Sequence, residues 1–404
     1  MIYFIHPLNT YVLKFGGSVL IDSNSSTNAS SLVKKLVDRG DSIVVVVSAL
    51  KGETDRLLQS ISGISNDKED TAEVIAMGER TSARLMAAAL KKANISAVLV
   101  DPKGENWPIF TYGDFLDADI DMDKTKKAVE ERIKPLLLKG MVPVVCGFMG
   151  LNGDGRIQTL GRGGSDTSAV VLGSCLGARE VVLLKDVGAA LTADPKKTNG
   201  TRTIDTLDAS EALALSMGGS KLIHAKAFRY LKGTNLRITS IELGLEGGTL
   251  IDGQTSVNLT ALDRDISMVT LVTRRATMDL VNSIGKILKE AGAELLGMTL
   301  GGRSLLLYLK GGSNVVDSLH SKLVNGEEVK AISEINNLAE ITVRSDFLER
   351  APGYISDITA PLSANEINIY GISTISNSIK LYILAKDLHN ALNLIKKELE
   401  DREL

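Results

Sequence analysis

The sequence alternates between short, almost wholly apolar stretches and longer stretches in which apolar residues recur every three or four positions. Residues 42–48 and 142–146 are apolar runs rich in valine, whereas 71–92 and 123–138 show the longer spacing. Continuous β-branched runs suit strands of a parallel sheet covered on both faces, and the longer spacing indicates amphipathic helices. Strands and helices in this order predict an α/β/α sandwich with a mostly parallel sheet.

The pattern changes in a polar stretch at residues 252–258, which marks a domain boundary. Beyond it the elements are shorter. Residues 266–323 and 339–399 both follow the order strand, helix, strand, strand, helix, which predicts an internal duplication of a ferredoxin-like unit. We therefore expect three domains, at residues 1–255, 256–335 and 336–404.

Composition narrows the classes of partner and the compartment. The 404 residues include 46 Lys plus Arg against 49 Asp plus Glu, which gives no electrostatic reason to expect nucleic acid or an acidic membrane as a partner. No uncharged run approaches the roughly 20 residues of a membrane span, and the apolar N-terminus is too short for a secretory signal. Cys146 and Cys175 both lie among apolar neighbours, which suits core residues in a reducing compartment. We expect a cytoplasmic protein without a metal site built from its four scattered histidines.

A glycine-rich stretch at residues 159–169 is the strongest candidate for a binding site. Its three glycines let the backbone approach a ligand closely, and the helix that follows begins with amides that have no intrahelical partner. Such a helix start attracts anions, and Arg162 adds a planar fork suited to a carboxylate or phosphate. The alternative is an ordinary glycine-rich turn in which Asp166 only caps the helix.

Three further loops follow predicted strands, at residues 14–18, 48–55 and 147–150. In open α/β sheets ligands bind beyond the carboxyl ends of the strands, where such loops meet helix starts. Lys14 stands at the end of an apolar strand and needs a partner or solvent; a phosphate oxygen would suit it, and Gly16 and Gly17 leave room. The alternative for Lys14 is a side chain that extends from the strand end into water.

Taken in order, these motifs resemble the aspartate kinases of the amino-acid-kinase family. The resemblance covers nearly the whole chain, because these enzymes also carry a C-terminal pair of ACT regulatory domains. The matching segments are residues 12–18, 47–49 with 54–55, 77–79, 147–150, 159–169, 192–195 and 219–224.

The resemblance implies ATP-dependent phosphorylation of the β-carboxylate of L-aspartate to 4-phospho-L-aspartate, the first step of lysine, threonine and methionine biosynthesis. Positioning and charge neutralisation would dominate this chemistry, because two anions must meet. By residue match, Lys14 stabilises the γ-phosphoryl group, Arg162 grips the substrate α-carboxylate, and Glu79 and Asp166 lie near its ammonium. Glu79 could instead be an exposed helix residue.

The same match assigns the remaining site residues. The catalytic set is Lys14, Arg162 and Asp166. The substrate set is Ser48, Thr54, Glu79, Phe148, Arg162, Gly163, Gly164 and Ser165. The nucleotide set is Lys14, Gly16, Gly17, Ser18, Lys185, Asp186, Leu191, Lys196 and Lys221.

The sequence departs from the family pattern around the nucleotide. The family's usual Thr-Asp pair falls on Lys185 and Asp186, the aromatic residue common beside the nucleotide is Leu191, and the arginine after Asp-Pro is Lys196. A lost aromatic contact weakens binding by roughly 1 kcal/mol. We therefore expect an altered nucleotide pocket in an enzyme that retains its catalytic residues.

The resemblance also implies cofactors and partners. Mg²⁺ is expected from ATP chemistry alone, since no pair of acidic residues announces a metal site by its spacing. Paired ACT domains imply a homodimer and feedback control by lysine or threonine, with dimerisation alone as the alternative. Two other functions stay open: a nonenzymatic amino-acid sensor, motivated by the altered loop at 188–191, and a kinase for another small carboxylate.

Overall fold

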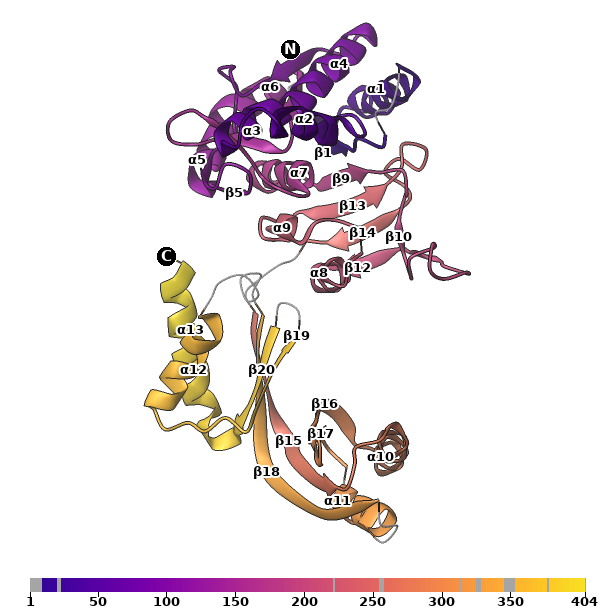
Figure 1. Ribbon diagram of the computed structural model, residues 1–404, viewed down its shortest axis with the longest axis vertical. Coiled ribbons are helices and arrows are strands. Elements are labelled where there is room, and N and C mark those ends of the chain that lie inside the picture. The colour runs from indigo at the N-terminus through magenta and orange to yellow at the C-terminus, as the bar shows by residue number, and fades with distance from the viewer. Residues whose placement is uncertain are drawn as a thin grey trace, which may run out of the picture. The chain divides into compact units, whose positions relative to one another are not determined.

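The computed structural model describes residues 9–19, 23–220, 222–253, 258–312, 314–324, 328–344, 353–375 and 378–403. The chain divides into two compact units, Met1–Thr255 and Ser256–Leu404. Figure 1 colours the first from indigo to pink and the second from orange to yellow. In the described part of the chain, no helix has the length and apolar character needed to cross a membrane.

An eight-stranded sheet forms the centre of the first unit (Figure 1). Every recorded pairing between its neighbours is parallel except that of β13 with β14, which confirms the predicted mostly parallel sheet. In spatial order the strands are β12 (Thr206–Asp208), β14 (Thr249–Asp252), β13 (Asn235–Thr239), β9 (Glu180–Leu184), β1 (Thr10–Phe15), β2 (Ser42–Val47), β6 (Val142–Cys146) and β3 (Ala97–Val100).

Helices complete the predicted α/β/α sandwich. Those of the first unit are α1 (Ser23–Asp38), α2 (Glu53–Ser62), α3 (Lys68–Ile75), α4 (Met77–Lys92), α5 (Met122–Ala128), the π-helix η1 (Val129–Ile133), α6 (Lys134–Leu138), α7 (Gly164–Leu176), α8 (Ala209–Met217) and α9 (Ala225–Phe228). Helix α1 packs on α4, while α7 packs on β1, β2, β9 and α9. The valines of β2 are fully buried between these layers, as its unbroken apolar run predicts.

Short two-stranded ribbons extend from the sandwich. They pair β4 (Thr111–Gly113) with β5 (Ala118–Ile120), β7 (Met149–Leu151) with β8 (Ile157–Thr159), and β10 (Ala190–Leu191) with β11 (Thr203–Ile204). All three pairings are antiparallel.

The predicted helix at 71–92 is in fact two helices, α3 and α4, which meet at Ala76. Helix α4 thereby starts where Gly78 lies against Ala49, so closely that a Cβ on Gly78 would be 2.7 Å from that of Ala49. The helical spacing continues through the junction, so periodicity alone did not reveal it.

The second unit is built on a six-stranded antiparallel sheet, and it confirms the predicted repeat of strand, helix, strand, strand, helix. Its strands in spatial order are β16 (Glu294–Leu300), β17 (Ser304–Lys310), β15 (Asn258–Thr273), β18 (Val329–Arg344), β20 (Ser378–Leu384) and β19 (Gly371–Ile375). Its helices are α10 (Met278–Ala291), α11 (Val315–Leu319), the π-helix η2 (His320–Val324), α12 (Tyr354–Ala364), the 3₁₀ helix η3 (Ala385–Asp387) and α13 (Leu388–Glu403).

Strands β15 and β18 are longer than the predicted strands at 266–273 and 339–345. Each has 16 residues, and they pair along their lengths. The register shifts between Leu262 and Ile266, between Ile266 and Met268, and between Val272 and Thr273. The proposed boundary between residues 335 and 336 lies inside β18, so the position of that boundary stays a prediction. Polar residues such as Glu334 and Asn336 obscured the first half of β18 in the sequence.

A stacked pair of tyrosines joins the two halves of this sheet. The rings of Tyr308 on β17 and Tyr382 on β20 are 3.8 Å apart and nearly parallel. The Tyr308 hydroxyl donates to the carbonyl of Tyr370 (3.1 Å), and the Tyr382 hydroxyl donates to Oε2 of Glu340 (2.8 Å). Both hydroxyls therefore have partners in a mostly apolar cluster.

Gly371 at the start of β19 should be intolerant of a side chain, because a Cβ there would lie 2.0 Å from the Tyr308 hydroxyl oxygen. We expect Gly371→Ala to lower the free energy of unfolding of the second unit by about 1–3 kcal/mol through overpacking. Urea unfolding followed by near-UV circular dichroism of the tyrosines would measure it.

The matched control is Gly285→Ala in the middle of α10, where a Cβ meets no atom within 4 Å. This substitution should raise stability by about 0.5–1 kcal/mol, because alanine is the better helix former. Equal unfolding midpoints for the two variants would contradict the prediction.

Candidate active site

Three charged side chains meet where β1 and β9 end and α7 begins. The two strands are parallel neighbours with Phe15 opposite Leu184, so Lys14 near the end of β1 and Lys185 just after β9 reach the same edge of the sheet. The Lys14 Nζ lies 2.7 Å from Oδ1 of Asp166, and the Lys185 Nζ lies 3.1 Å from Oδ2. One carboxylate is thus shared between two ammonium groups.

This cluster, Lys14–Asp166–Lys185, is nearly shielded from water. Side-chain exposure is 8% for Lys14, 8% for Asp166 and 20% for Lys185. Burial raises the pKa of the Asp166 carboxyl, but the charges and hydrogen bonds of Lys14 and Lys185 overcome burial and hold that pKa well below its ordinary value. Two cations against one anion leave an excess positive charge, which fits a phosphate group.

Two simpler readings of these residues are wrong. Lys14 is buried and paired, so its side chain does not extend from the strand end into water. Asp166 lies within the first turn of α7, whose N-cap is Gly163, so Asp166 is not a mere helix cap.

Glu79 lies in the first turn of α4 and is buried, so it is not an exposed helix residue. Its Oε1 accepts a hydrogen bond from the Ala49 amide (3.0 Å), while Oε2 has no hydrogen-bond partner among the described residues. Burial raises the pKa of Glu79 to about 7, although the Ala49 amide and the charge of Lys14 oppose the rise. A cationic group beside Oε2 would satisfy this carboxylate.

Glycine 17 brings the loop after β1 against the loop after β2. A Cβ at Gly17 would lie 2.4 Å from the carbonyl oxygen of Ala49, so only glycine fits there. The Gly16 amide donates to Leu184 (3.2 Å) and the Ser48 amide donates to Phe15 (3.1 Å). These bonds fix the strand ends around Lys14.

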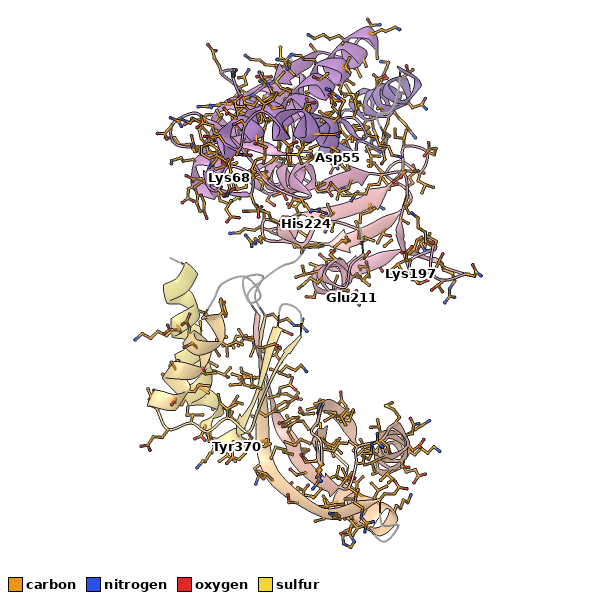
Figure 2. All side chains as sticks on the ribbon, in the orientation of Figure 1. Asp55, Lys68, Lys197, Glu211, His224 and Tyr370 are labelled. Atoms are coloured by element: carbon orange, nitrogen blue, oxygen red, sulfur yellow. The ribbon has the colours of Figure 1, made fainter. Side chains whose placement is uncertain are left out.

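The stretch before α7 needs glycine at position 163. Gly163 has φ +71°, and a Cβ there would lie 2.2 Å from that of His224, which is labelled in Figure 2. Phe148 also has a positive φ, 76°, which is uncommon for a residue with a side chain, and its amide donates to the Ser168 hydroxyl (3.0 Å). Strain of this kind concentrates at functional sites.

Arg162 stands out because it is exposed two residues before α7 begins, whereas residues 164–173 of that helix are all buried. Within the described ranges, no hydrogen bond or ion pair engages its guanidinium group. Gly164 and Ser165, two and three residues further on, are buried at the start of α7. Thr54 and Ser48 are half-buried, in the first turn of α2 and after β2. Gly164, Ser165, Thr54 and Ser48 stay predicted substrate contacts.

The remaining predicted nucleotide residues are not joined to the cluster. Asp186 is exposed and accepts from the Val187 amide (3.0 Å), Leu191 is half-buried in β10, and the exposed Lys196 donates its amide to Asp194 (2.9 Å). Ser18 is half-buried in the loop after β1. Lys221 lies outside the described residues. The structure brings together Lys14, Lys185 and Asp166, and the other nucleotide assignments stay predictions.

Sequence reasoning missed Lys226 on α9. Its buried Nζ lies 2.6 Å from Asp117 Oδ1 and donates to the carbonyls of Ala118 (2.7 Å) and Leu160 (3.1 Å). It thereby ties the start of β5 to the residue before Gly161. A lone lysine in the apolar run Ala225–Phe228 was the available signal.

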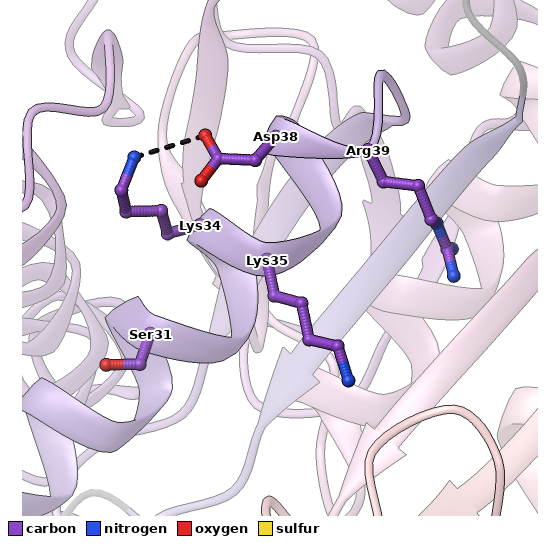
Figure 3. A pocket seen from close by; sticks show the side chains of 5 residues that line it. All are labelled: Ser31, Lys34, Lys35, Asp38 and Arg39. Atoms are coloured by element: carbon purple, nitrogen blue, oxygen red, sulfur yellow. Dashed lines mark hydrogen bonds and ion pairs between the residues drawn. The ribbon is translucent and has the colours of Figure 1, made fainter.

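Figure 3 shows a surface hollow along α1, lined by Ser31, Lys34, Lys35, Asp38 and Arg39, in which Lys34 pairs with Asp38 at 3.1 Å. No predicted site residue lines it.

Among the residues with described positions, no three His, Cys, Asp or Glu side chains gather as metal ligands would. Both cysteines are free and buried, and burial raises the pKa of the Cys146 thiol to about 12.

A buried lysine–aspartate cluster at the carboxyl edge of a parallel sheet, beside a glycine-rich helix start, is typical of α/β proteins that bind phosphate groups. The model of the amino acid kinase family matches residues 9–240, and the chain belongs to that family.

Within this family, the chain is similar to aspartate kinases. The chain is 33% identical over 249 residues to the aspartate kinase of Pseudomonas fluorescens, a match that spans 59% of this chain and 58% of that protein. It is 28% identical over 414 residues to the aspartokinase of Pseudomonas aeruginosa, spanning 96% and 97% of the two chains. The predicted resemblance to aspartate kinases is thus confirmed.

Solved structures share the fold. Aspartokinase III of E. coli in complex with aspartate and ADP superposes with a TM-score of 0.56 at 21% identity, covering 96% of this chain and 99% of that one. The same enzyme in complex with lysine and aspartate gives 0.54 at 21% identity, covering 97% and 99%.

Lys226 should contribute to stability through its three hydrogen-bond partners. We expect Lys226→Met to lower the free energy of unfolding of the first unit by about 2 kcal/mol, since two buried carbonyls lose their donor. Thermal unfolding would measure it, with the exposed Lys232→Met as the matched control. An unchanged melting temperature for Lys226→Met would contradict this assignment.

Proposed function

We propose that this protein is an aspartate kinase that transfers the γ-phosphoryl group of ATP to the β-carboxylate of L-aspartate, giving 4-phospho-L-aspartate for lysine, threonine and methionine biosynthesis. The observation that carries the proposal is the buried Lys14–Asp166–Lys185 cluster, with the exposed Arg162 four residues before Asp166 in the sequence. The similarity over nearly the full chain to an aspartokinase supports it. So does the fold shared with an enzyme crystallised with aspartate and ADP.

In this proposal each charged residue binds a group of opposite charge on the substrate or nucleotide. Lys14, with the amides of Gly16 and Gly17, neutralises charge on the transferred phosphoryl group. Arg162 binds the α-carboxylate through paired hydrogen bonds, and Glu79 offers its unpartnered oxygen to the ammonium. ATP with Mg²⁺ supplies the phosphoryl group. No proton transfer is needed, because the substrate carboxylate is already a nucleophile and the protein acts by positioning and electrostatics.

Regulation and assembly belong to the same proposal. We assign residues 256–335 and 336–404 to two ACT domains that pair in a cytoplasmic homodimer and bind lysine or threonine. The unit of antiparallel sheet and helices supports this assignment, as does the shared fold of an aspartokinase crystallised with lysine.

The proposal is tested with the purified full-length chain, MgATP and L-aspartate, by trapping the acyl phosphate as the hydroxamate. We expect aspartate-dependent product, and Arg162→Lys should raise the KM for aspartate by roughly tenfold with little change for ATP, because lysine cannot form the bidentate pair. Arg303→Lys, an exposed position of the second unit, is the control.

Other outcomes have definite meanings. No acyl phosphate at saturating substrates would overturn the proposal. Calorimetric binding of lysine or threonine without binding of ATP would then identify an amino-acid sensor, and turnover of another small carboxylate would identify a different kinase. Equal effects of Arg162→Lys on both substrates would contradict the role of Arg162.

The pH dependence of aspartate use follows from Glu79. Its pKa of about 7 means that the carboxylate is protonated below neutral pH, where it cannot pair with the substrate ammonium. The KM for aspartate should therefore fall by roughly tenfold from about pH 6 to about pH 8 and then level. Steady-state kinetics would measure this, and Glu79→Gln should give a high KM that does not vary with pH. A dependence that survives in Glu79→Gln would assign it elsewhere.

A further inference from the structure

Lys185 is the feature of the site that the family pattern does not explain. Aspartate kinases usually have an uncharged threonine at this position, as the motif match indicates. Here the side chain is long enough for its ammonium to reach Asp166, which already pairs with Lys14.

Hydrogen bonds to neighbouring segments fix the backbone and the side chain of Lys185. Its amide donates to the carbonyl of Thr239 (2.8 Å) at the end of the neighbouring β13. Its Nζ donates to the carbonyl of Leu222 as well as to Asp166. The ammonium is therefore held at the carboxyl edge of the sheet, on the Asp166 oxygen that Lys14 leaves free.

The charges of this arrangement are unbalanced. Asp166 can neutralise one of its two lysines. A further carboxyl, Glu79, feels the charge of Lys14, but it accepts from Ala49 and is buried enough to raise its pKa, so it is a weak second counterion. Keeping two mostly buried ammonium groups is costly unless an anion completes the site.

We propose that Lys185 is a second phosphate-binding catalytic residue, which with Lys14 flanks the phosphate chain of the nucleotide. This inference rests on the proposed function. As an aspartate carboxylate oxygen bonds to the γ-phosphorus, the bond from that phosphorus to the bridging oxygen breaks and its electron pair stays on ADP. Lys185 stabilises the negative charge that gathers on the phosphates, and no proton moves.

Under this proposal Lys185 offsets the affinity for the nucleotide that is lost in the altered loop at 188–191. Leu191 replaces an aromatic contact to the base, and an added cation at the phosphates supplies affinity at the other end of the nucleotide. Recognition thus shifts from the base towards the phosphates, and inorganic tripolyphosphate should bind the protein and compete with ADP.

The test compares Lys185→Gln, Lys185→Arg and the exposed Lys139→Met in the full-length chain. Glutamine keeps hydrogen-bond donors for Asp166 and Leu222 but removes the charge. We expect Lys185→Gln to weaken ADP and tripolyphosphate binding by roughly tenfold in calorimetry and to lower kcat by roughly 100-fold, with the KM for aspartate unchanged. Lys185→Arg should recover most of the binding, and Lys139→Met should behave as the unaltered protein.

The outcomes separate this inference from the proposed function. ADP and tripolyphosphate binding unchanged in Lys185→Gln would overturn it, whether or not the melting temperature falls, because Lys185 would then only tie α7 to the segment at Leu222. Weakened binding in Lys185→Gln, with an unaltered protein that binds ADP but forms no acyl phosphate, would uphold the anion site and reject aspartate kinase activity.

Discussion

A single buried carboxylate organises the first unit's chemistry. Asp166 holds Lys14 and Lys185 on its two oxygens, and each of the three comes from a different element. The arrangement requires that β1 and β9 be parallel neighbours and that α7 begin at their carboxyl edge. The sheet is therefore what makes the charge cluster possible, and the cluster in turn gives a buried lysine the partner without which it would destabilise the strand.

Around this cluster, close backbone packing constrains the loops. One buried carboxylate oxygen of the site has no hydrogen-bond partner among the described residues. Gly17 and Gly163 permit contacts that any side chain would block, and Phe148 holds a backbone conformation that its neighbours must enforce. Glu79 keeps one oxygen without a partner. Polar groups that the fold already holds in position lose little conformational entropy when a ligand binds, and they need little reorganisation during the reaction. Such preorganised groups stabilise charge in the transition state most effectively.

The resemblance to the aspartate kinases singled out Lys14, Glu79 and Asp166, whose roles stay proposals. The sequence predicted the sheet and the duplicated second unit, because strand periodicity and the order of elements are local properties. It did not predict that Lys185 reaches Asp166 or that Lys226 binds the carbonyl of Leu160, since both depend on which strand ends become neighbours. The junction of α3 and α4 and the full lengths of β15 and β18 were missed for a related reason: tertiary contacts set them, while the hydrophobic pattern stays continuous or turns polar.

The two long strands of the second unit, β15 and β18, each belong to the sheets of both repeats. The first half of β18 completes the sheet of the first repeat beside β15, while residues 258–262 of β15 lie beside the second half of β18 in the other repeat. Each repeat thus lends the other an edge strand. The two repeats are therefore interlocked, so neither can be excised whole, and a displacement of β15 or β18 caused by a ligand at one repeat is imposed on the other through the same covalent strand.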